Sequence, residues 1–261
     1  MASPDLGSLI EAARTAPVTA ATAARAMALI DLTSLKGGES SAEIAALCGR
    51  AVSHRTAAIC VYAEALPAAR PLLAGSGVRL ATVANFPHGG DDIVAAAEET
   101  AAAVAAGADE VDVVAPIGAL LEGDVGLVGE LIEACRAAAG PEITLKVILE
   151  TGALREPDLI TAAARAAVMA GVDFLKTSTG KIEAGATLEA AATLLAVCRE
   201  AGGRVGFKAA GGIRTAADAA AYLHLADAIM GAGWASPRTF RFGASALLDD
   251  LLGRGGAGSG Y

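Results

Sequence analysis

The pattern that decides the fold is clearest at residues 109–150, which read DEVDVVAPIGALLEGDVGLVGELIEACRAAAGPEITLKVILE. This stretch begins with the short apolar run DEVDVV, continues through the helical pattern LVGELIEACRAAAG, and ends in the second run TLKVILE. Alternation of a strand, a helix and another strand is typical of a parallel sheet. We therefore interpret the stretch as one strand–helix unit followed by the strand of the next unit.

The same unit recurs along the chain. Eight short apolar runs alternate with longer Ala-rich segments that have helical periodicity. Eight units of roughly thirty residues account for nearly all of the 261 residues, which predicts an α/β fold consisting of a single (β/α)8 TIM barrel. The eight runs are AMALIDLT (26–33), AAICVY (57–62), VRLATVAN (78–85), DEVDVV (109–114), TLKVILE (144–150), DFLKTST (173–179), RVGFKA (204–209) and ADAIMG (226–231).

Helix-end signals separate these runs. Thr215 with Asp218 three residues later resembles a capping box, and Glu156-Pro157 reads as a cap followed by a first-turn proline. Glycines follow four helical segments, where a left-handed C-terminal cap is wanted. These glycines are Gly107, Gly140, Gly171 and Gly202.

The competing architecture is an open doubly wound sheet. That fold usually carries G-x-G-x-x-G after its first strand, and this sequence has no such motif there. Because no linker divides the chain, we expect residues 1–261 to form one barrel domain. Its first residues, to about 25, would be a short helical extension, and its glycine-rich end, from about 253, a flexible tail.

Composition argues against several classes of protein. The net charge is −9 and lysine and arginine do not cluster, so we expect no binding to nucleic acid or to a membrane surface. No apolar stretch is long enough to cross a bilayer, and the N-terminus lacks the pattern of a signal peptide. We expect a cytoplasmic protein. The sequence does not fix the oligomeric state, for which a homodimer is the working expectation.

Cysteine and histidine carry no signal of a disulfide or a metal. The four cysteines form no C-x-x-C pair, so reduced structural thiols are the simplest interpretation. His54, His88 and His224 are scattered without the spacing of metal ligands. We therefore expect no metal site.

Charged residues interrupt strands that should be continuously apolar in a buried parallel sheet. The steps from Asp112 to Lys146, from there to Lys176, and on to Lys208 are 34, 30 and 32 residues, each close to the length of one strand–helix unit. We therefore expect these side chains to converge inside the barrel at one level. They are Asp31 in the first run, Asp112 in the fourth, Lys146 in the fifth, Lys176 in the sixth and Lys208 in the seventh.

Converging lysines indicate a particular chemistry. Lysine is scarce, with five residues against fifteen arginines, yet three of the five lie within strands. A lone strand-end lysine usually extends its ammonium to solvent, but a buried one costs several kcal/mol unless it is paired. A neighbouring ammonium and a dry pocket lower the pKa of a lysine, which makes it nucleophilic and able to form a Schiff base. A nearby carboxylate could then move protons.

Two glycine-containing segments suggest a phosphate site. AAGGIRT at residues 209–215 follows the seventh run, and adjacent glycines let backbone N–H groups approach an anion. RFGASALLDDLL at residues 241–252 reads as a helix that Gly243, Ala244 and Ser245 open. Loops after strands seven and eight form the phosphate site of many barrels. TGK at residues 179–181 could add a third wall, although it is not a P-loop.

These motifs resemble a known family. DFLKTSTGK at residues 173–181 resembles the Schiff-base signature of class I deoxyribose-phosphate aldolases, and GFKAAGGIRT at 206–215 resembles their second lysine segment. Similar matches, in the same order, run from about Leu29 to about Leu252. The other matching segments are NFPHG (85–89), GADEVDVV (107–114), LKVILETGAL (145–154) and RFGAS (241–245).

The resemblance implies a role for each matching residue. Lys176 would form the imine, Lys208 would lower the pKa of Lys176, and Asp112 would transfer protons. Tyr261 resembles a C-terminal tyrosine that closes over the site in some members. The implied substrate pocket also contains Asp31, Cys60, Lys146 and Thr177, although Asp31 and Lys146 could equally belong to a surrounding polar network, and packing alone would explain Cys60. The implied phosphate-binding residues are Gly180, Lys181, Gly211, Gly212, Arg214, Gly243 and Ser245.

The resemblance also implies a reaction, with a phosphosugar and small aldehydes as partners. It is the reversible cleavage of 2-deoxy-D-ribose 5-phosphate to acetaldehyde and D-glyceraldehyde 3-phosphate, and it needs no metal or organic cofactor. One rival is another Schiff-base barrel enzyme that acts on a different phosphosugar. A rival of another class is a non-catalytic phosphosugar-binding protein, which would have no reason to keep a pair of lysines.

Overall fold

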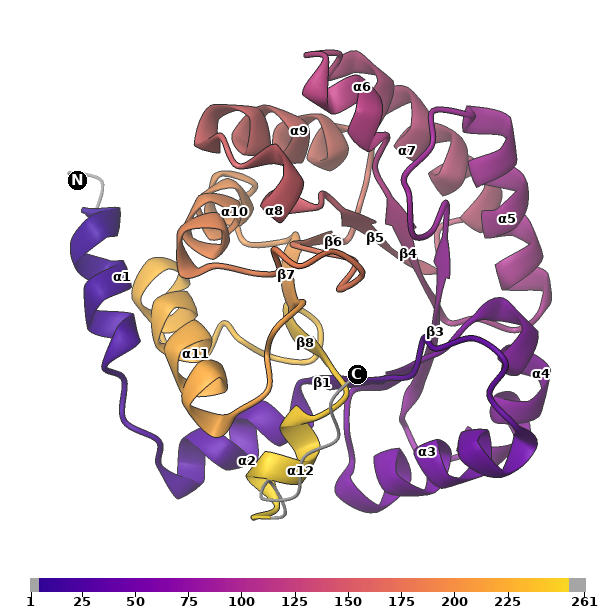
Figure 1. Cartoon of the computed structure of the whole chain (residues 1–261), viewed down its shortest axis with the longest axis horizontal. Coiled ribbons are helices and arrows are strands. Elements are labelled where there is room, and N and C mark those ends of the chain that lie inside the picture. The colour runs from indigo at the N-terminus through magenta and orange to yellow at the C-terminus, as the bar shows by residue number, and fades with distance from the viewer. Residues whose placement is uncertain (1–4, 254–261) are drawn as a thin grey trace.

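A computed structural model describes residues 5–253, and its centre is a closed barrel of parallel strands (Figure 1). Each strand pairs with the next, and β8 pairs with β1, so the sheet has no open edge. This confirms the predicted (β/α)8 TIM barrel. The strands are β1 (Ile30–Thr33), β2 (Ala58–Cys60), β3 (Arg79–Ala84), β4 (Glu110–Val114), β5 (Thr144–Ile148), β6 (Phe174–Lys176), β7 (Gly206–Ala210) and β8 (Phe240–Ala244).

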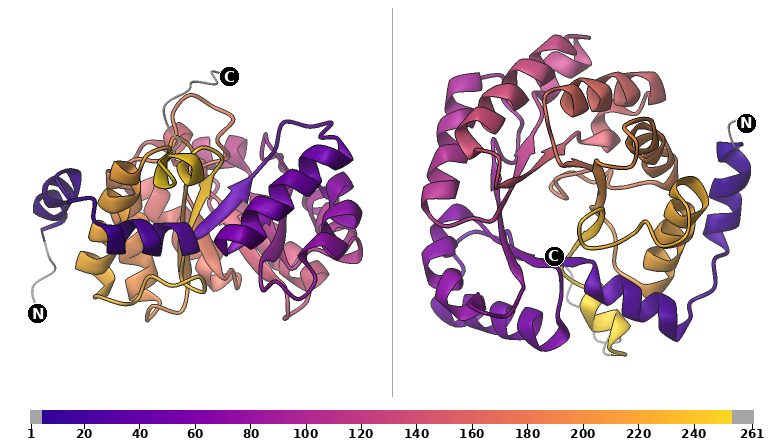
Figure 2. Two further views of the ribbon diagram at one scale, coloured as in Figure 1. Left: turned by 90° about the horizontal axis from the view of Figure 1, so that it is seen from below. Right: turned by 180° about the vertical axis from the view of Figure 1, so that it is seen from behind.

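Helices surround the barrel on all sides, and α1 lies outside this ring against α11 (Figures 1 and 2). None of the helices in residues 5–253 combines the length and apolarity of a membrane span. The expected tail, with Tyr261, lies outside the described residues beyond Gly253. The α-helices are α1 (Leu6–Arg14), α2 (Ala20–Ala28), α3 (Ser41–His54), α4 (Leu66–Ala69), α5 (Ile93–Ala105), α6 (Ile117–Leu121), α7 (Gly126–Ala139), α8 (Thr151–Leu154), α9 (Pro157–Met169), α10 (Leu188–Glu200), α11 (Ala216–Met230) and α12 (Leu247–Leu251); the 3-10 helices are η1 (Ala63–Ala65) and η2 (Arg70–Leu73).

The predicted helix ends agree with the structure. The Thr215 side chain accepts from the backbone N–H of Asp218, and the Asp218 carboxylate accepts from that of Thr215, which completes a capping box at the start of α11. Pro157 occupies the first turn of α9, although Glu156 makes no side-chain cap bond. The four glycines after helices all have positive φ, at 97° for Gly107, 75° for Gly140, 90° for Gly171 and 73° for Gly202.

The predicted eighth strand was wrong. ADAIMG (226–231) continues α11, because Tyr222, Leu225, Ala226 and Ile229 are buried at helical spacing behind the capping box. A short apolar run does not by itself distinguish a strand from a buried helix. The strand that closes the barrel is Phe240–Ala244, so the predicted helix opening at Gly243 and Ala244 was also wrong. Helix α12 begins only at Leu247.

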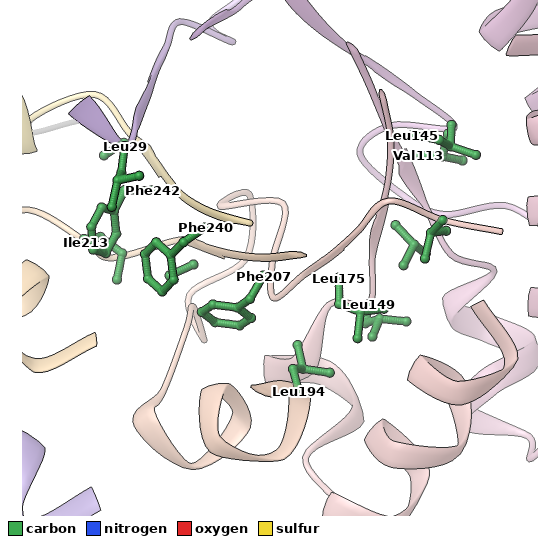
Figure 3. Packing of buried hydrophobic residues seen from close by; sticks show 14 of the residues in the cluster. Leu29, Val113, Leu145, Leu149, Leu175, Leu194, Phe207, Ile213, Phe240 and Phe242 are labelled. Atoms are coloured by element: carbon green, nitrogen blue, oxygen red, sulfur yellow. The ribbon is translucent and has the colours of Figure 1, made fainter. Parts of the chain in front are cut away.

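The main hydrophobic core lies between the strands and the helices. Figure 3 shows Phe207, Phe240 and Phe242 next to one another along β7 and β8, with ring centroids 5.5 and 4.9 Å apart for successive pairs. Leu149, Leu175 and Leu194 continue this layer toward α10. Side chains alternate across a strand, so the strand residues next to this apolar layer point into the barrel. Among them are the charged residues Lys176, Lys208 and Arg241.

Two aspartates fix the register at the amino ends of the strands. Asp109 accepts from the backbone N–H of Leu80 at 2.8 Å, and Asp173 accepts from that of Leu145 at 2.8 Å. Asp109 is also bonded to Arg70 at 2.7 Å, so one carboxylate ties a strand to a helix. These bonds hold β3 against β4 and β5 against β6, which sets the level of the side chains inside the barrel.

We predict that Gly206→Ala destabilises the fold. A Cβ on Gly206 would lie 2.5 Å from the ring of Phe174, which is buried and has the Arg241 guanidinium 5.6 Å from its centroid. Such overpacking should lower the free energy of unfolding by about 1–3 kcal/mol in urea denaturation. Gly49→Ala is the matched control, because a Cβ there meets nothing within 4 Å and the site is in α3. It should raise the free energy by up to about 1 kcal/mol. Equal effects would contradict the packing argument.

Candidate active site

The structure brings Asp112 and three lysines together inside the barrel. Asp112 lies on β4, and Lys146, Lys176 and Lys208 lie on β5, β6 and β7. The Asp112 carboxylate accepts from Lys146 Nζ on Oδ1 at 2.7 Å. It accepts from Lys176 Nζ at 2.9 Å and from Lys208 Nζ at 2.8 Å on Oδ2. All four side chains are buried. One carboxylate therefore accepts hydrogen bonds from three lysine side chains of three successive strands.

Strand register explains this convergence. Asp112 is the direct partner of Lys146 across β4 and β5, and Lys176 is the direct partner of Lys208 across β6 and β7. Partners at the same register position point to the same side of the sheet. Lys176 is the last residue of β6, so its ammonium lies nearer the carboxyl-terminal mouth of the barrel, where barrel enzymes have their active sites.

Asp31 joins this group from β1. Its Oδ2 accepts from Lys208 at 2.5 Å, and its Oδ1 accepts from Arg241 at 2.6 Å. The Arg241 guanidinium also donates to Glu110 at 2.8 Å, and Lys146 lies 2.7 Å from the other oxygen of Glu110. Both Arg241 and Glu110 are buried.

Glu110 and Arg241 escaped the sequence analysis. Glu110 precedes Asp112 by two residues, so strand alternation puts both on one face, and that signal was available. Arg241 was missed because the eighth strand was placed at residues 226–231 instead of 240–244.

Burial and neighbouring charges have opposite effects on the pKa of Asp112 and of Asp31. Burial alone would raise the pKa of Asp112, but the ammonium groups of Lys146, Lys176 and Lys208 hold it well below its usual value. The pKa of Asp31 is raised by burial and lowered more strongly by Lys208 and Arg241, so it too lies below the ordinary range. Both carboxylates are therefore ionised acceptors.

The three lysines differ in pKa. Burial lowers the pKa of Lys208, but Asp112 and Asp31 raise it above the ordinary value. Burial likewise lowers the pKa of Lys146, and Asp112 and Glu110 raise it more. For Lys176 burial dominates, Asp112 compensates only in part and Lys208 adds repulsion, so its pKa is lowered. Lys176 is thus the lysine that most readily becomes a neutral amine.

Cys60 and Thr177 lie beside this group but differ in their contacts. Cys60, on β2, packs with Leu35 and Val83 in a small apolar cluster, and burial raises the pKa of its thiol. Thr177 follows Lys176 and uses its hydroxyl on the backbone of Ala210, accepting from its N–H and donating to its carbonyl, each at 3.0 Å. Thr177 therefore ties the end of β6 to β7.

Glycines bring the loops after β6 and β7 into close contact. A Cβ on Gly185 would lie 2.4 Å from the carbonyl oxygen of Gly211, and one on Gly211 would lie 3.2 Å from Cβ of Ser178. Gly180, Gly211 and Gly212 all have positive φ, at 77°, 88° and 87°. Only residues without a side chain allow this approach at no cost. The structure thereby brings together two of the three expected phosphate-binding segments.

The remaining expected phosphate residues surround the same mouth. Lys181 is exposed and donates from Nζ to the carbonyl of Leu35, so it spans from the β6 loop to the loop after β1. Arg214 and Ser245 are exposed. Gly243 is half-buried, and a Cβ there would lie 3.0 Å from Cε of Lys208. Gly243 therefore leaves room for the Lys208 side chain.

A further buried carboxylate, Glu150, was also missed by the sequence analysis. It follows β5 in a left-handed conformation with φ of 48°, and its Oε2 accepts from both the backbone N–H and the hydroxyl of Thr179. The Thr179 hydroxyl accepts in turn from the N–H of Lys181 at 3.1 Å. These bonds hold the start of the TGK segment. Among residues 5–253, no cluster of three or more histidine, cysteine, aspartate or glutamate residues is arranged to hold a metal ion.

Comparison with known proteins agrees with the barrel fold. Solved structures of similar fold include a protein from Coccidioides immitis and one from Toxoplasma gondii ME49, both provisionally assigned as deoxyribose-phosphate aldolases. The first is 29% identical with a TM-score of 0.79, and the match covers 97% of this chain and 100% of that one. The second is 25% identical with a TM-score of 0.81, and the match covers 89% and 92%.

A more distant structure supports the fold alone. It is the tetrameric deoxyribose phosphate aldolase from Aeropyrum pernix, at 22% identity and a TM-score of 0.74, with 95% of this chain and 97% of that chain covered. At the level of the family, the profile of the DeoC/LacD family aldolases matches residues 25–253. Because this match spans most of the sequence, the chain belongs to the DeoC/LacD family of aldolases.

Proposed function

We propose that this protein reversibly cleaves 2-deoxy-D-ribose 5-phosphate to acetaldehyde and D-glyceraldehyde 3-phosphate, with Lys176 as the Schiff-base nucleophile. The observation that carries the proposal is the state of Lys176. It is buried, its pKa is lowered, and it shares one carboxylate oxygen of Asp112 with the ammonium of Lys208. That combination favours a neutral amine at the carboxyl-terminal mouth of a barrel.

The proposed reaction proceeds in balanced steps. The Lys176 amine adds to the C1 aldehyde, and loss of water gives an iminium. The C3 hydroxyl then loses its proton as the C2–C3 bond breaks, and the electron pair moves through C2 to the iminium nitrogen, giving an enamine and glyceraldehyde 3-phosphate. Protonation of the enamine at C2 and addition of water release acetaldehyde. Asp112 is the proposed proton carrier, and Lys208 lies within 2.8 Å of it.

The loops at the mouth support a phosphorylated substrate. Backbone N–H groups of a glycine pair and the Lys181 ammonium suit a phosphate dianion. Gly211 and Gly212 follow β7, and Lys181 follows β6, so both segments border the end of the barrel at which Lys176 lies. A non-catalytic binding protein would not need the buried lysine pair. Another Schiff-base aldolase of different substrate would share it, and substrate profiling separates that rival.

Borohydride trapping should label Lys176. Incubation with acetaldehyde followed by sodium borohydride is expected to leave a two-carbon adduct on this residue, read by intact mass and peptide mapping. The rate of labelling should rise with pH and level off below the ordinary lysine pKa of 10.5, because the Lys176 pKa is lowered and only the neutral amine attacks. Lys176→Met should abolish the adduct, and Lys181→Met should retain it. A folded wild-type protein without an adduct would refute the Schiff-base proposal.

Asp112→Asn should lower turnover of deoxyribose 5-phosphate by about 100-fold or more, because the proton carrier is lost. Steady-state cleavage assays measure this effect. Asp109→Asn is the matched control at the amino end of β4, where the carboxylate holds Leu80 and Arg70. It should reduce stability and leave turnover of the folded protein near that of the wild type. Similar losses of turnover in both variants would assign Asp112 to structure alone.

Lys181→Met should raise KM for the 5-phosphate about tenfold and change cleavage of unphosphorylated deoxyribose little, because a charge-assisted contact to phosphate is lost. Lys36→Met removes a lysine from the neighbouring loop after β1 and serves as the control. Steady-state kinetics with both sugars measure the effect. An equal change for both substrates would place Lys181 outside the phosphate site.

A further inference from the structure

The buried charges inside the barrel form a closed ring. Within the ring, each carboxylate contacts two of the ring's cations, and each cation contacts two of its carboxylates. Following the ring, Glu110 meets Lys146 at 2.7 Å, Lys146 meets Asp112 at 2.7 Å, Asp112 meets Lys208 at 2.8 Å, Lys208 meets Asp31 at 2.5 Å, Asp31 meets Arg241 at 2.6 Å, and Arg241 meets Glu110 at 2.8 Å.

The ring is electrically balanced. It contains three carboxylates, from Glu110, Asp112 and Asp31, and three cations, from Lys146, Lys208 and Arg241. Lys176 stands outside it and shares only Asp112, on the oxygen that Lys208 also uses. A protonated Lys176 would therefore be a fourth cation against three carboxylates in a buried space, where an uncompensated charge is costly.

We propose that Glu110 and Arg241 are positioning residues that complete this ring, so that, among the described residues, Lys176 is left as the buried amine without a carboxylate of its own. The inference rests on the proposed function, because it explains how Lys176 becomes the nucleophile. Glu110 is the first residue of β4 and Arg241 the second of β8, which places both deeper in the barrel than Lys176, away from the mouth. Their effect on Lys176 is electrostatic.

Removing either residue should disturb the balance in a defined direction. Without Arg241 the ring keeps three carboxylates and two cations, so a proton on Lys176 restores neutrality and its ammonium form is favoured. Without Glu110 the ring keeps three cations and two carboxylates, so a proton on Lys176 is disfavoured further. Removing both leaves two of each, as balanced as the native ring. Packing effects alone have no reason to follow this sign pattern.

The charge effect that we assign to the ring is not supplied by the other polar groups near it. Cys60, from β2, is a neutral thiol because burial raises its pKa. Arg79, from β3, reaches Glu110 at 3.8 Å from a side chain that is 46% exposed, so solvent screens it. Glu150, at the end of β5, is bonded to Thr179. Asp112 and Lys208, which contact or repel Lys176 directly, are themselves ring members.

The test is the pH profile of imine formation in the full-length protein. Wild type, Glu110→Gln, Arg241→Gln and the double variant are mixed with acetaldehyde, quenched with borohydride at short times, and read by intact mass. The acid limb of the rate should move to lower pH in Glu110→Gln and to higher pH in Arg241→Gln, each by about one unit, which is about tenfold in rate below the limb. The double variant should return close to the wild-type profile.

Several results would overturn the inference. One is that the wild type forms the adduct but neither single variant moves the acid limb of the pH profile. Another is that both single variants move the acid limb in the same direction. A third is that the acid limb of the double variant is shifted as far as that of a single variant. If Arg241→Gln does not fold, which circular dichroism reveals, the Glu110→Gln limb and its reversal in the charge-balanced double variant decide the matter. A wild type that forms no adduct would refute the Schiff-base proposal first, and the role of the ring with it.

Discussion

The need to balance charge among buried side chains governs this structure. An ammonium or carboxylate that is removed from solvent inside the barrel requires an opposite partner at contact distance. Asp112 contacts all three lysines, whereas Asp31 contacts Lys208 and Arg241, and Glu110 contacts Lys146 and Arg241. Lys146 and Lys208 each contact two carboxylates, whereas Lys176 contacts only Asp112, and the lowered pKa of Lys176 is consistent with that difference.

The backbone makes the balance possible. Parallel register aligns Asp112 with Lys146 and Lys176 with Lys208, and closure of β8 on β1 brings Arg241 near Asp31. Asp109 and Asp173 fix that register from the amino ends of the strands through backbone N–H groups. The rigid sheet thus sets distances that flexible lysine side chains could not hold by themselves.

The mouth of the barrel follows a different constraint, which is steric. Gly180, Gly185 and Gly211 allow the loops after β6 and β7 to touch, and Glu150 holds Thr179, the first residue of the TGK segment. The result is that these two loops meet at the carboxyl-terminal mouth of the barrel, where Lys176 ends β6. The proposed reaction needs a neutral amine inside the barrel and a phosphate-binding loop at its mouth, and this arrangement is compatible with both.

Much of this was determined by the sequence itself. Strand–helix periodicity predicts the barrel, and the spacing of Asp112, Lys146, Lys176 and Lys208 predicts their convergence, because both depend on local pattern and on a constant unit length. Tertiary structure decided the rest. A short apolar run such as ADAIMG takes its state from its surroundings, so only closure of the sheet identifies Phe240–Ala244 as the last strand and places Arg241 inside. The closed ring joins β1, β4, β5, β7 and β8, and contacts between strands so distant in the chain exist only once the barrel has closed.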